Sequence, residues 1–216
     1  MRLRFRQAGR RLRLALIVCA AGAAVLCRST GESPAADKAR DLPDDGTAAG
    51  RTLDEWATDV DSPNRIVRLR AVKMLGVFGA DAVPALTAAL ANPDDGVKYW
   101  AASALGDVGP SAAPAAPRLR KIVGQDRPAL EISAAYALCR IGRLDEGMPI
   151  LIAGVKQPDK AIACCAADFL ARIGPPARAA LRALKTATDS RDTHIARASR
   201  EALRRIDREG VSDDAQ

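Results

Sequence analysis

The chain has 216 residues, of which only 3% are aromatic and 27% are charged. So few aromatic residues, with no sustained apolar–polar alternation, exclude a β-sandwich and favour helices packed through small side chains. The net charge of +7 arises in residues 1–28, which hold seven arginines and no acid, while the other 26 basic residues balance 26 acidic ones. A neutral body lacks the basic surface that a phosphate backbone requires, so we expect no nucleic-acid partner.

Residues 1–27 have the pattern of an export signal. Residues 1–13 are strongly basic, and an uncharged run of 14 residues follows from Leu14 to Cys27. A membrane-spanning helix needs about 20 apolar residues, whereas the core of a signal peptide takes roughly 7–15. We predict a signal peptide, or alternatively an N-terminal membrane anchor, on a protein exported to the periplasm or cell envelope. The cleavage site and lipidation of Cys27 stay open, and we expect membrane contact only through this segment.

Two segments are predicted to be disordered. Residues 28–50 are rich in Pro, Gly, Ser, Asp and Ala and contain one large apolar side chain, Leu42. Such a segment buries too little surface to offset the entropy lost on ordering, so we expect a linker. We expect residues 210–216 to form a disordered tail, which leaves residues 51–209 as the folded domain.

Five segments of the predicted domain repeat one pattern centred on a leucine. A Val, Leu or Ile precedes each leucine by eight residues, a small residue precedes it by four, and an apolar residue follows it by three. These offsets lie on one face of a helix. The leucines, spaced by 30, 33, 32 and 33 residues, are Leu75, Leu105, Leu138, Leu170 and Leu203. The glycines that we expect to end the first four helices with a positive φ are Gly79, Gly109, Gly142 and Gly174.

A second helix is predicted before each of these. Its apolar positions open with Trp56, Leu86, Leu119, Leu151 and Leu184. Thr52 and Glu55 have the spacing of a capping box at the start of the first such helix. Pairs such as Asn92-Pro93 mark the turn between paired helices. The sequence therefore predicts an all-α fold, a right-handed α-solenoid of about five two-helix repeats.

The blocks SPNRIVRLRAVKMLGVFG and NPDDGVKYWAASALGDVG, with Pro84 and Pro114 five residues after a glycine, resemble the short HEAT-like repeats of the bilin-lyase type. The resemblance covers about residues 52–208 and implies a HEAT-like solenoid. The opening GRTLDEWATDVDSP also resembles the first repeat of exported HEAT proteins from planctomycete-type bacteria.

The resemblance leaves three functions open. The first is a non-catalytic scaffold that binds a protein or peptide partner on its concave face. The second is a lyase-like or chaperone role on a cofactor-bearing protein, since relatives of that type attach a tetrapyrrole to a cysteine of a partner. An export signal argues against this role, because such light-harvesting antennae assemble in the cytoplasm. The third is a purely structural repeat module.

We expect no catalytic residue, metal or cofactor, and no enzyme. The HEAT-like deoxyhypusine hydroxylases bind iron through His–Glu pairs, and this chain has one histidine, His194. Cys164 and Cys165 are adjacent, whereas a zinc pair requires intervening residues. We expect these cysteines and Cys139 to be packing residues, with a disulfide from Cys139 left open.

The second helix of each repeat also predicts a binding surface. At 100° per residue, positions two and six before the leucine lie opposite the core. There we expect Tyr99, Ile132 and Tyr136 to be exposed and to cluster, with Trp100 on the flank; the alternative is that Tyr99 and Trp100 pack between repeats. The predicted partner-binding residues are Leu69, Lys73, Tyr99, Trp100, Ile132 and Tyr136.

Overall fold

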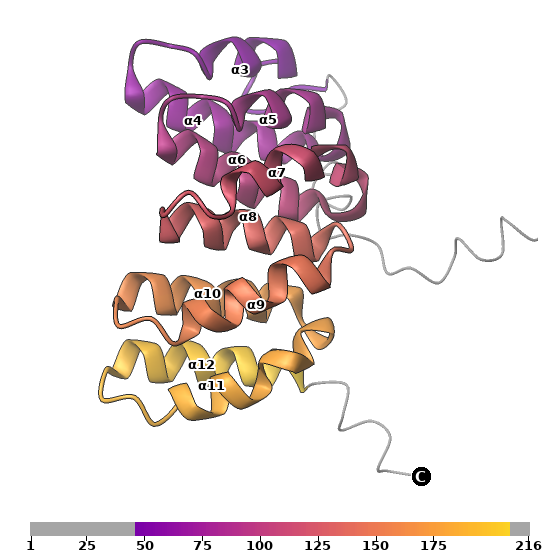
Figure 1. The fold of residues 1–216 in the computed structure, drawn as a ribbon. Coiled ribbons are helices and arrows are strands. Elements are labelled where there is room, and N and C mark those ends of the chain that lie inside the picture. Colours follow the sequence, from indigo (N-terminus) through magenta and orange to yellow (C-terminus); the bar gives the residue numbers. More distant parts are fainter. Residues whose placement is uncertain (1–45, 208–216) are drawn as a thin grey trace, which may run out of the picture. The chain divides into compact units, whose positions relative to one another are not determined.

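The computed structural model describes residues 46–207, and these residues form a stack of five helix pairs (Figure 1). The first helices of the pairs are α3 (Leu53–Asp59), α5 (Val83–Ala89), α7 (Ala116–Ile122), α9 (Leu144–Val155) and α11 (Leu181–Ala187). The second helices are α4 (Arg65–Leu75), α6 (Asp95–Val108), α8 (Pro128–Arg140), α10 (Lys160–Ile173) and α12 (Thr193–Ile206). Short 3-10 helices connect three of the repeats: η1 (Gly76–Ala82), η2 (Gly109–Ala115) and η3 (Pro175–Ala180).

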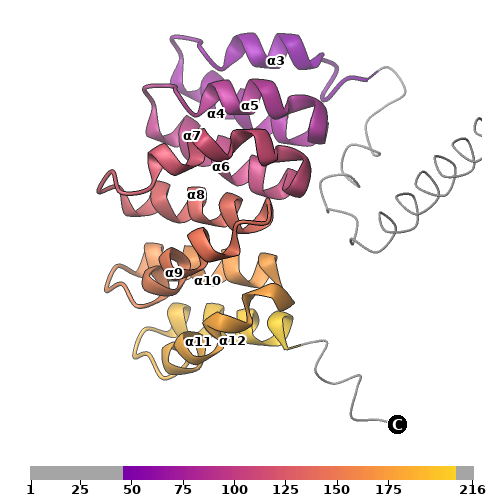
Figure 2. The same ribbon diagram turned by 45° about the vertical axis from the view of Figure 1, so that its right-hand side comes forward.

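The pairs are arranged in two layers. The first helices lie side by side in one layer and the second helices in the other, in the order of the sequence (Figures 1 and 2). No strand occurs between residues 46 and 207, where the sole bridge joins Ala48 and Arg51. The predicted all-α solenoid of five repeats is confirmed. The predicted signal segment, most of the predicted linker and the predicted tail lie outside the described residues.

The leucine-centred seam forms the core. Leu75, Leu105, Leu138 and Leu170 are all at most 1% exposed. Burying a leucine side chain contributes about 1.5–3 kcal/mol. The small residues one turn earlier are fully buried as well: Ala71, Ala101, Ala134, Ala166 and Ser199. Leu203, on the last helix that the structure describes, is only partly buried.

The first repeat is closed by the residues just before it. Trp56 is 1% exposed, and its indole Nε1 donates to the carbonyl oxygen of Ala48 at 2.9 Å. The Arg51 guanidinium lies 4.3 Å from the centre of the indole ring, and the Arg70 guanidinium lies at 5.5 Å. Ala48, which the sequence places in the linker, therefore packs on α3.

A glycine with positive φ lies at or shortly after the end of each of the first four second helices, as predicted. Gly79 has φ 60° and Gly109 has φ 74°, a backbone conformation that other residues adopt at a cost. The break at Gly79 divides Arg65–Ala89, which would be long and apolar enough by composition alone to cross a membrane.

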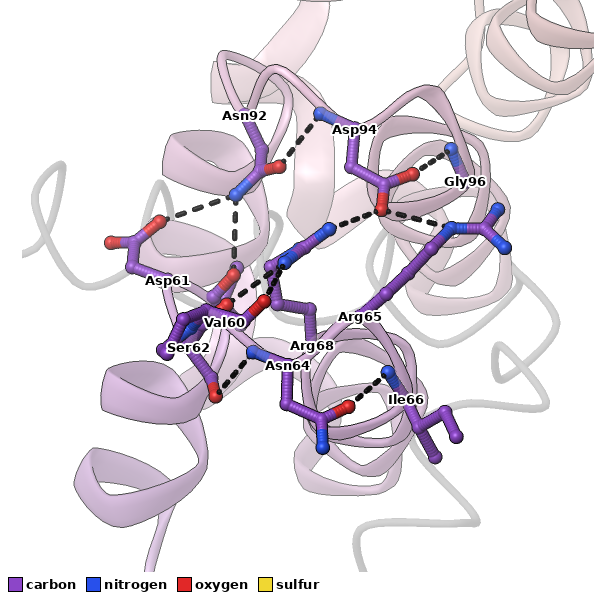
Figure 3. Close-up of polar contacts among 11 residues, drawn as sticks. Val60, Asp61, Ser62, Asn64, Arg65, Ile66, Arg68, Asn92, Asp94 and Gly96 are labelled. Carbon is purple, nitrogen blue, oxygen red and sulfur yellow. Dashed lines mark hydrogen bonds and ion pairs between the residues drawn. The ribbon is translucent and has the colours of Figure 1, made fainter.

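Polar side chains in the turns hold the first two repeats in register (Figure 3). Asp94 caps α6 by accepting from the Gly96 amide at 2.9 Å. Its other oxygen accepts from Arg68 Nη2 at 2.8 Å and from Arg65 Nε at 3.3 Å. Asn92 donates back to the Val60 carbonyl at 3.2 Å. The network thus joins the turn of one repeat to the turn of the next.

Replacing Asp94 with alanine should lower the free energy of unfolding by about 2 kcal/mol at pH 7, since it removes a helix cap and leaves the half-buried Arg68 without its carboxylate. The Arg68 hydrogen bond holds the Asp94 pKa below its usual value. A carboxyl whose pKa is lower in the folded than in the unfolded state stabilises the fold above about pH 4, and this stabilisation is lost as the pH falls through the folded pKa. The difference between wild type and Asp94→Ala in urea denaturation should therefore shrink below pH 4.

Two variants separate the cap from the charge. Asp94→Asn keeps the cap and should lose less stability than Asp94→Ala. Asp81→Ala removes an exposed carboxylate and should cost less than about 0.5 kcal/mol. A loss for Asp94→Ala that persisted unchanged at pH 3 would contradict the ionic part of this account.

Candidate protein-binding surface

The six predicted partner-binding residues fall into two groups. The prediction that Ile132 and Tyr136 are exposed is wrong, because they are 2% and 1% exposed. Leu69 and Tyr99 are half-buried, whereas Lys73 is exposed and Trp100 is 37% exposed. Only the residues from α4 and α6 therefore contribute to an accessible surface.

The buried group lies on α8, which neighbouring helices enclose. Every residue from Ile132 to Cys139 is buried. The α9 helix approaches α8 so closely that a Cβ on Gly147 would lie 2.3 Å from the Ala135 carbonyl oxygen. On the α6 side, a Cβ on Gly106 would lie 2.5 Å from Cε1 of Tyr136. The helical projection assumes one buried face per helix, and α8 has no face that remains open.

Tyr136 links three second helices. Its hydroxyl donates to Asp107 Oδ1 of α6 at 2.7 Å, and its ring stacks on Phe169 of α10 with centroids 4.4 Å apart. The Arg172 guanidinium lies 4.6 Å from the Tyr136 ring centre and forms an ion pair with Asp107. Burial raises the pKa of Tyr136 above its usual value, so the phenol remains a neutral donor. This residue is a structural element of the core rather than a contact for a partner.

Tyr99 also packs between repeats, as the alternative expectation stated. Its ring centre lies 6.4 Å from that of Phe169, and its hydroxyl lies 3.2 Å from Sγ of Cys165. Tyr99 thus reaches from α6 to α10, two repeats along the chain. Burial is the main cause that raises its pKa.

Trp100 stays accessible and joins α6 to α4. Its ring meets Tyr99 edge-on with centroids 5.4 Å apart, and Nζ of Lys73 lies 4.0 Å from its ring centre. On α4, Ile66, Leu69 and Lys73 follow each other at intervals of three and four residues and so share one helix face. We call the surface formed by Ile66, Leu69, Lys73, Tyr99 and Trp100 the α4–α6 patch.

Ile66 is the member of this patch that the sequence reasoning missed. It is 77% exposed, and among the residues that the structure describes only Ile66 and Trp100 are large, apolar and exposed. Ile66 lies nine residues before Leu75, and nine steps of 100° place it about 180° from that leucine. Extending the projection by one turn would have found it.

The charges around the patch are mainly positive. Helix α4 contains Arg65, Arg68, Arg70 and Lys73 and no acidic residue. Arg65 and Arg68 contact Asp94, whereas Arg70 and Lys73 cover aromatic rings. The exposed apolar side chains of the patch therefore have cationic neighbours.

The remaining candidates for chemistry lie apart. Cys139, Cys164 and Cys165 are free thiols, and burial raises the pKa of Cys139 to about 12, which keeps its thiol protonated and unreactive. His194 lies exposed in the first turn of α12. Between residues 46 and 207 no three His, Cys, Asp or Glu side chains are grouped as metal ligands.

Stacked helix pairs with a shared core define an α-solenoid, the class in which each repeat packs only on its neighbours. Residues 54–139 match the family model of HEAT repeats, in agreement with the resemblance seen in the sequence. No curated protein matches the sequence.

The solved structures similar to this chain include a natural complex and two engineered or designed proteins. The complex of CpcE and CpcF of phycocyanin lyase from Nostoc sp. PCC7120 is 22% identical, with a TM-score of 0.51 over 74% of this chain and 68% of that chain. An engineered protein is 19% identical, with a TM-score of 0.49 over 72% of this chain and 79% of its own. A designed armadillo repeat protein is 14% identical, with a TM-score of 0.44 over 71% of this chain and 82% of its own. At 22% identity the similarity to the lyase complex is one of fold.

Proposed function

We propose that this protein is an exported, non-catalytic scaffold that binds a protein or peptide partner through the α4–α6 patch, on the face of the second helices. The observation that carries the proposal is the exposure of Ile66 (77%) and Trp100 (37%) on neighbouring helices. Among the described residues only these two large apolar side chains are exposed, and exposed apolar surface that gathers in one region marks interaction sites.

The composition of the patch supports a protein partner. Tryptophan and tyrosine are enriched among the residues that dominate binding energy. Trp100 is held by Tyr99 on one side and Lys73 on another, so its ring loses little freedom when a partner covers it. Solenoids commonly bind partners on extended surfaces built from successive repeats.

The charge of α4 supports an acidic partner. Lys73 beside Trp100, on a helix with no acidic residue, would favour a segment in which a carboxylate flanks an apolar side chain, with the apolar group on Ile66 or Trp100. Opposite charges at the rim of an interface accelerate association and select against basic partners.

Export forms part of the same proposal. The basic residues 1–13 and the uncharged run from Leu14 to Cys27 support it. A partner would then be found in the periplasm or cell envelope.

Site-specific photocrosslinking tests the proposal. A photoreactive phenylalanine at position 66, in native cells, should crosslink to one or a few envelope proteins that mass spectrometry can identify. The matched control places the same group at Ala88, an exposed position on α5 in the other layer. We expect the crosslinks from position 66 to be absent from position 88, and to fall several-fold when Trp100→Ala is added without a change in helix content. Identical products from both positions, or none from position 66, would refute a partner site on this patch.

The lyase-like alternative has a separate readout. A chain that handles a tetrapyrrole should change the visible absorbance of that pigment on mixing, and a scaffold should not. This measurement needs no knowledge of the partner.

A further inference from the structure

A groove separates α9 and α11 in the layer of first helices. Its volume is about 650 Å³, within the range of ligand sites. The equivalent space between α3 and α5 is about 280 Å³. The groove lies in other repeats than the α4–α6 patch and in the other layer, so a ligand bound there would be independent of the proposed function.

Small side chains of η3 and α11 open this groove. Ala179 of η3 and Ala183 and Ala187 of α11 line it at intervals of four residues and together form its alanine face. Opposite them, Ile152 and Val155 of α9 provide apolar walls. The alanine methyl groups are short, so space remains between them and the branched side chains of α9. Larger residues at the three alanine positions would fill this space.

The charge in the groove has one sign. Lys156 and Arg182 line it and both are exposed. The other polar side chains in the lining, Gln157, Thr186 and Ser190, are uncharged, and no carboxylate lines the groove. Within residues 46–207 neither cation has a carboxylate within ion-pairing distance. A guanidinium in this position can bind both oxygens of a carboxylate.

We propose that the groove between α9 and α11 binds a fatty-acid-like carboxylate, with its alkyl chain along the alanine face and its carboxylate between Arg182 and Lys156. The lining of the groove supports both parts of this ligand, the alkyl chain and the carboxylate. The apolar walls favour an alkyl chain over a free polar anion, and the two cations favour an anion over an uncharged or cationic amphiphile.

Isothermal titration of the full-length chain with dodecanoate, below the concentration at which it forms micelles, tests this proposal. We expect Arg182→Gln to weaken dodecanoate binding by at least about tenfold, because it removes a charge-assisted contact. The matched control is Arg178→Gln, which makes the same change in charge one turn earlier at an exposed position outside the lining; it should bind as the wild type does. Ala179→Leu, at an exposed position that lines the groove, should also weaken binding by filling the groove.

Four results would overturn the proposal. They are the absence of dodecanoate binding, equal binding by Arg182→Gln and Arg178→Gln, equal affinity for dodecyltrimethylammonium, and unchanged binding by Ala179→Leu. Binding to vesicles of anionic phospholipid is a further measurement, which distinguishes a free carboxylate from a membrane surface. If the vesicles bind wild type and Arg182→Gln equally while dodecanoate does not bind, a surface outside the groove contacts the membrane and the groove is not a ligand site. Thermal melts of all variants verify that the fold is retained.

Discussion

Tyr136→Ala should lower the free energy of unfolding by about 3–5 kcal/mol, because it leaves a cavity among three helices. The ring that would be lost is 1% exposed and stacks on Phe169. The hydroxyl that would be lost donates to Asp107, which would keep Arg172 as its partner. Since many domains are stable by only 5–15 kcal/mol, the variant should unfold at a much lower urea concentration, as followed by far-UV circular dichroism.

Tyr136→Phe is the matched control. It retains the stacked ring and removes one hydrogen bond, so we expect a loss of about 1 kcal/mol. A variant Tyr136→Ala as stable as Tyr136→Phe would mean that the ring lies in solvent, as the sequence pattern alone had indicated. A loss of partner binding by Tyr136→Ala would report unfolding and not a lost contact, which is why the crosslinking experiment uses Ile66 and Trp100.

Gly147→Ala should cost about 2–3 kcal/mol, although alanine is the better helix former by about 1 kcal/mol. The added Cβ would lie 2.3 Å from the carbonyl oxygen of Ala135 and 2.6 Å from Sγ of Cys139. The nearer atom belongs to the backbone of α8, so no side-chain rotation can relieve the overlap. The two helices must move apart, and the packing around Leu138 and Leu151 weakens with them.

Gly76→Ala supplies the comparison. A Cβ at Gly76 would have one close neighbour, Cβ of Ala104 at 3.3 Å, and the φ of Gly76 is −60°, which alanine adopts freely. We expect this variant to be within about 0.5 kcal/mol of the wild type. Equal urea midpoints for Gly147→Ala and Gly76→Ala would contradict the close approach of α9 to α8.

The repeat architecture could be predicted from the sequence because its signals are local. The position of Leu105 relative to Val97, Ala101 and Val108 specifies a helix face without reference to any other part of the chain. The glycine after that helix and the capping box at Thr52 and Glu55 are equally local, and both occur as predicted. A pattern that recurs five times also averages out the ambiguity of any one segment.

The candidate surface could be predicted only in part, because exposure depends on how many helices surround a position. Lys73 and Trp100 are accessible as expected, although every residue from Ala101 to Gly106 of α6 is buried. Tyr136 occupies the same position in the pattern as Lys73, and Ile132 the same position as Tyr99, and both are buried.

The order of residues along the chain was enough to specify the class of fold, the number of repeats and the residues of the leucine seam. Which of the predicted surface residues reach solvent depended on how the helices pack in three dimensions. Gly106 and Gly147 lack a side chain at the points where α6 and α9 approach α8. The distance between two helices therefore depends on residues of both helices. A helical projection treats one helix at a time and gives no distance between helices. The residues of α8 alone therefore could not predict that its neighbours enclose it.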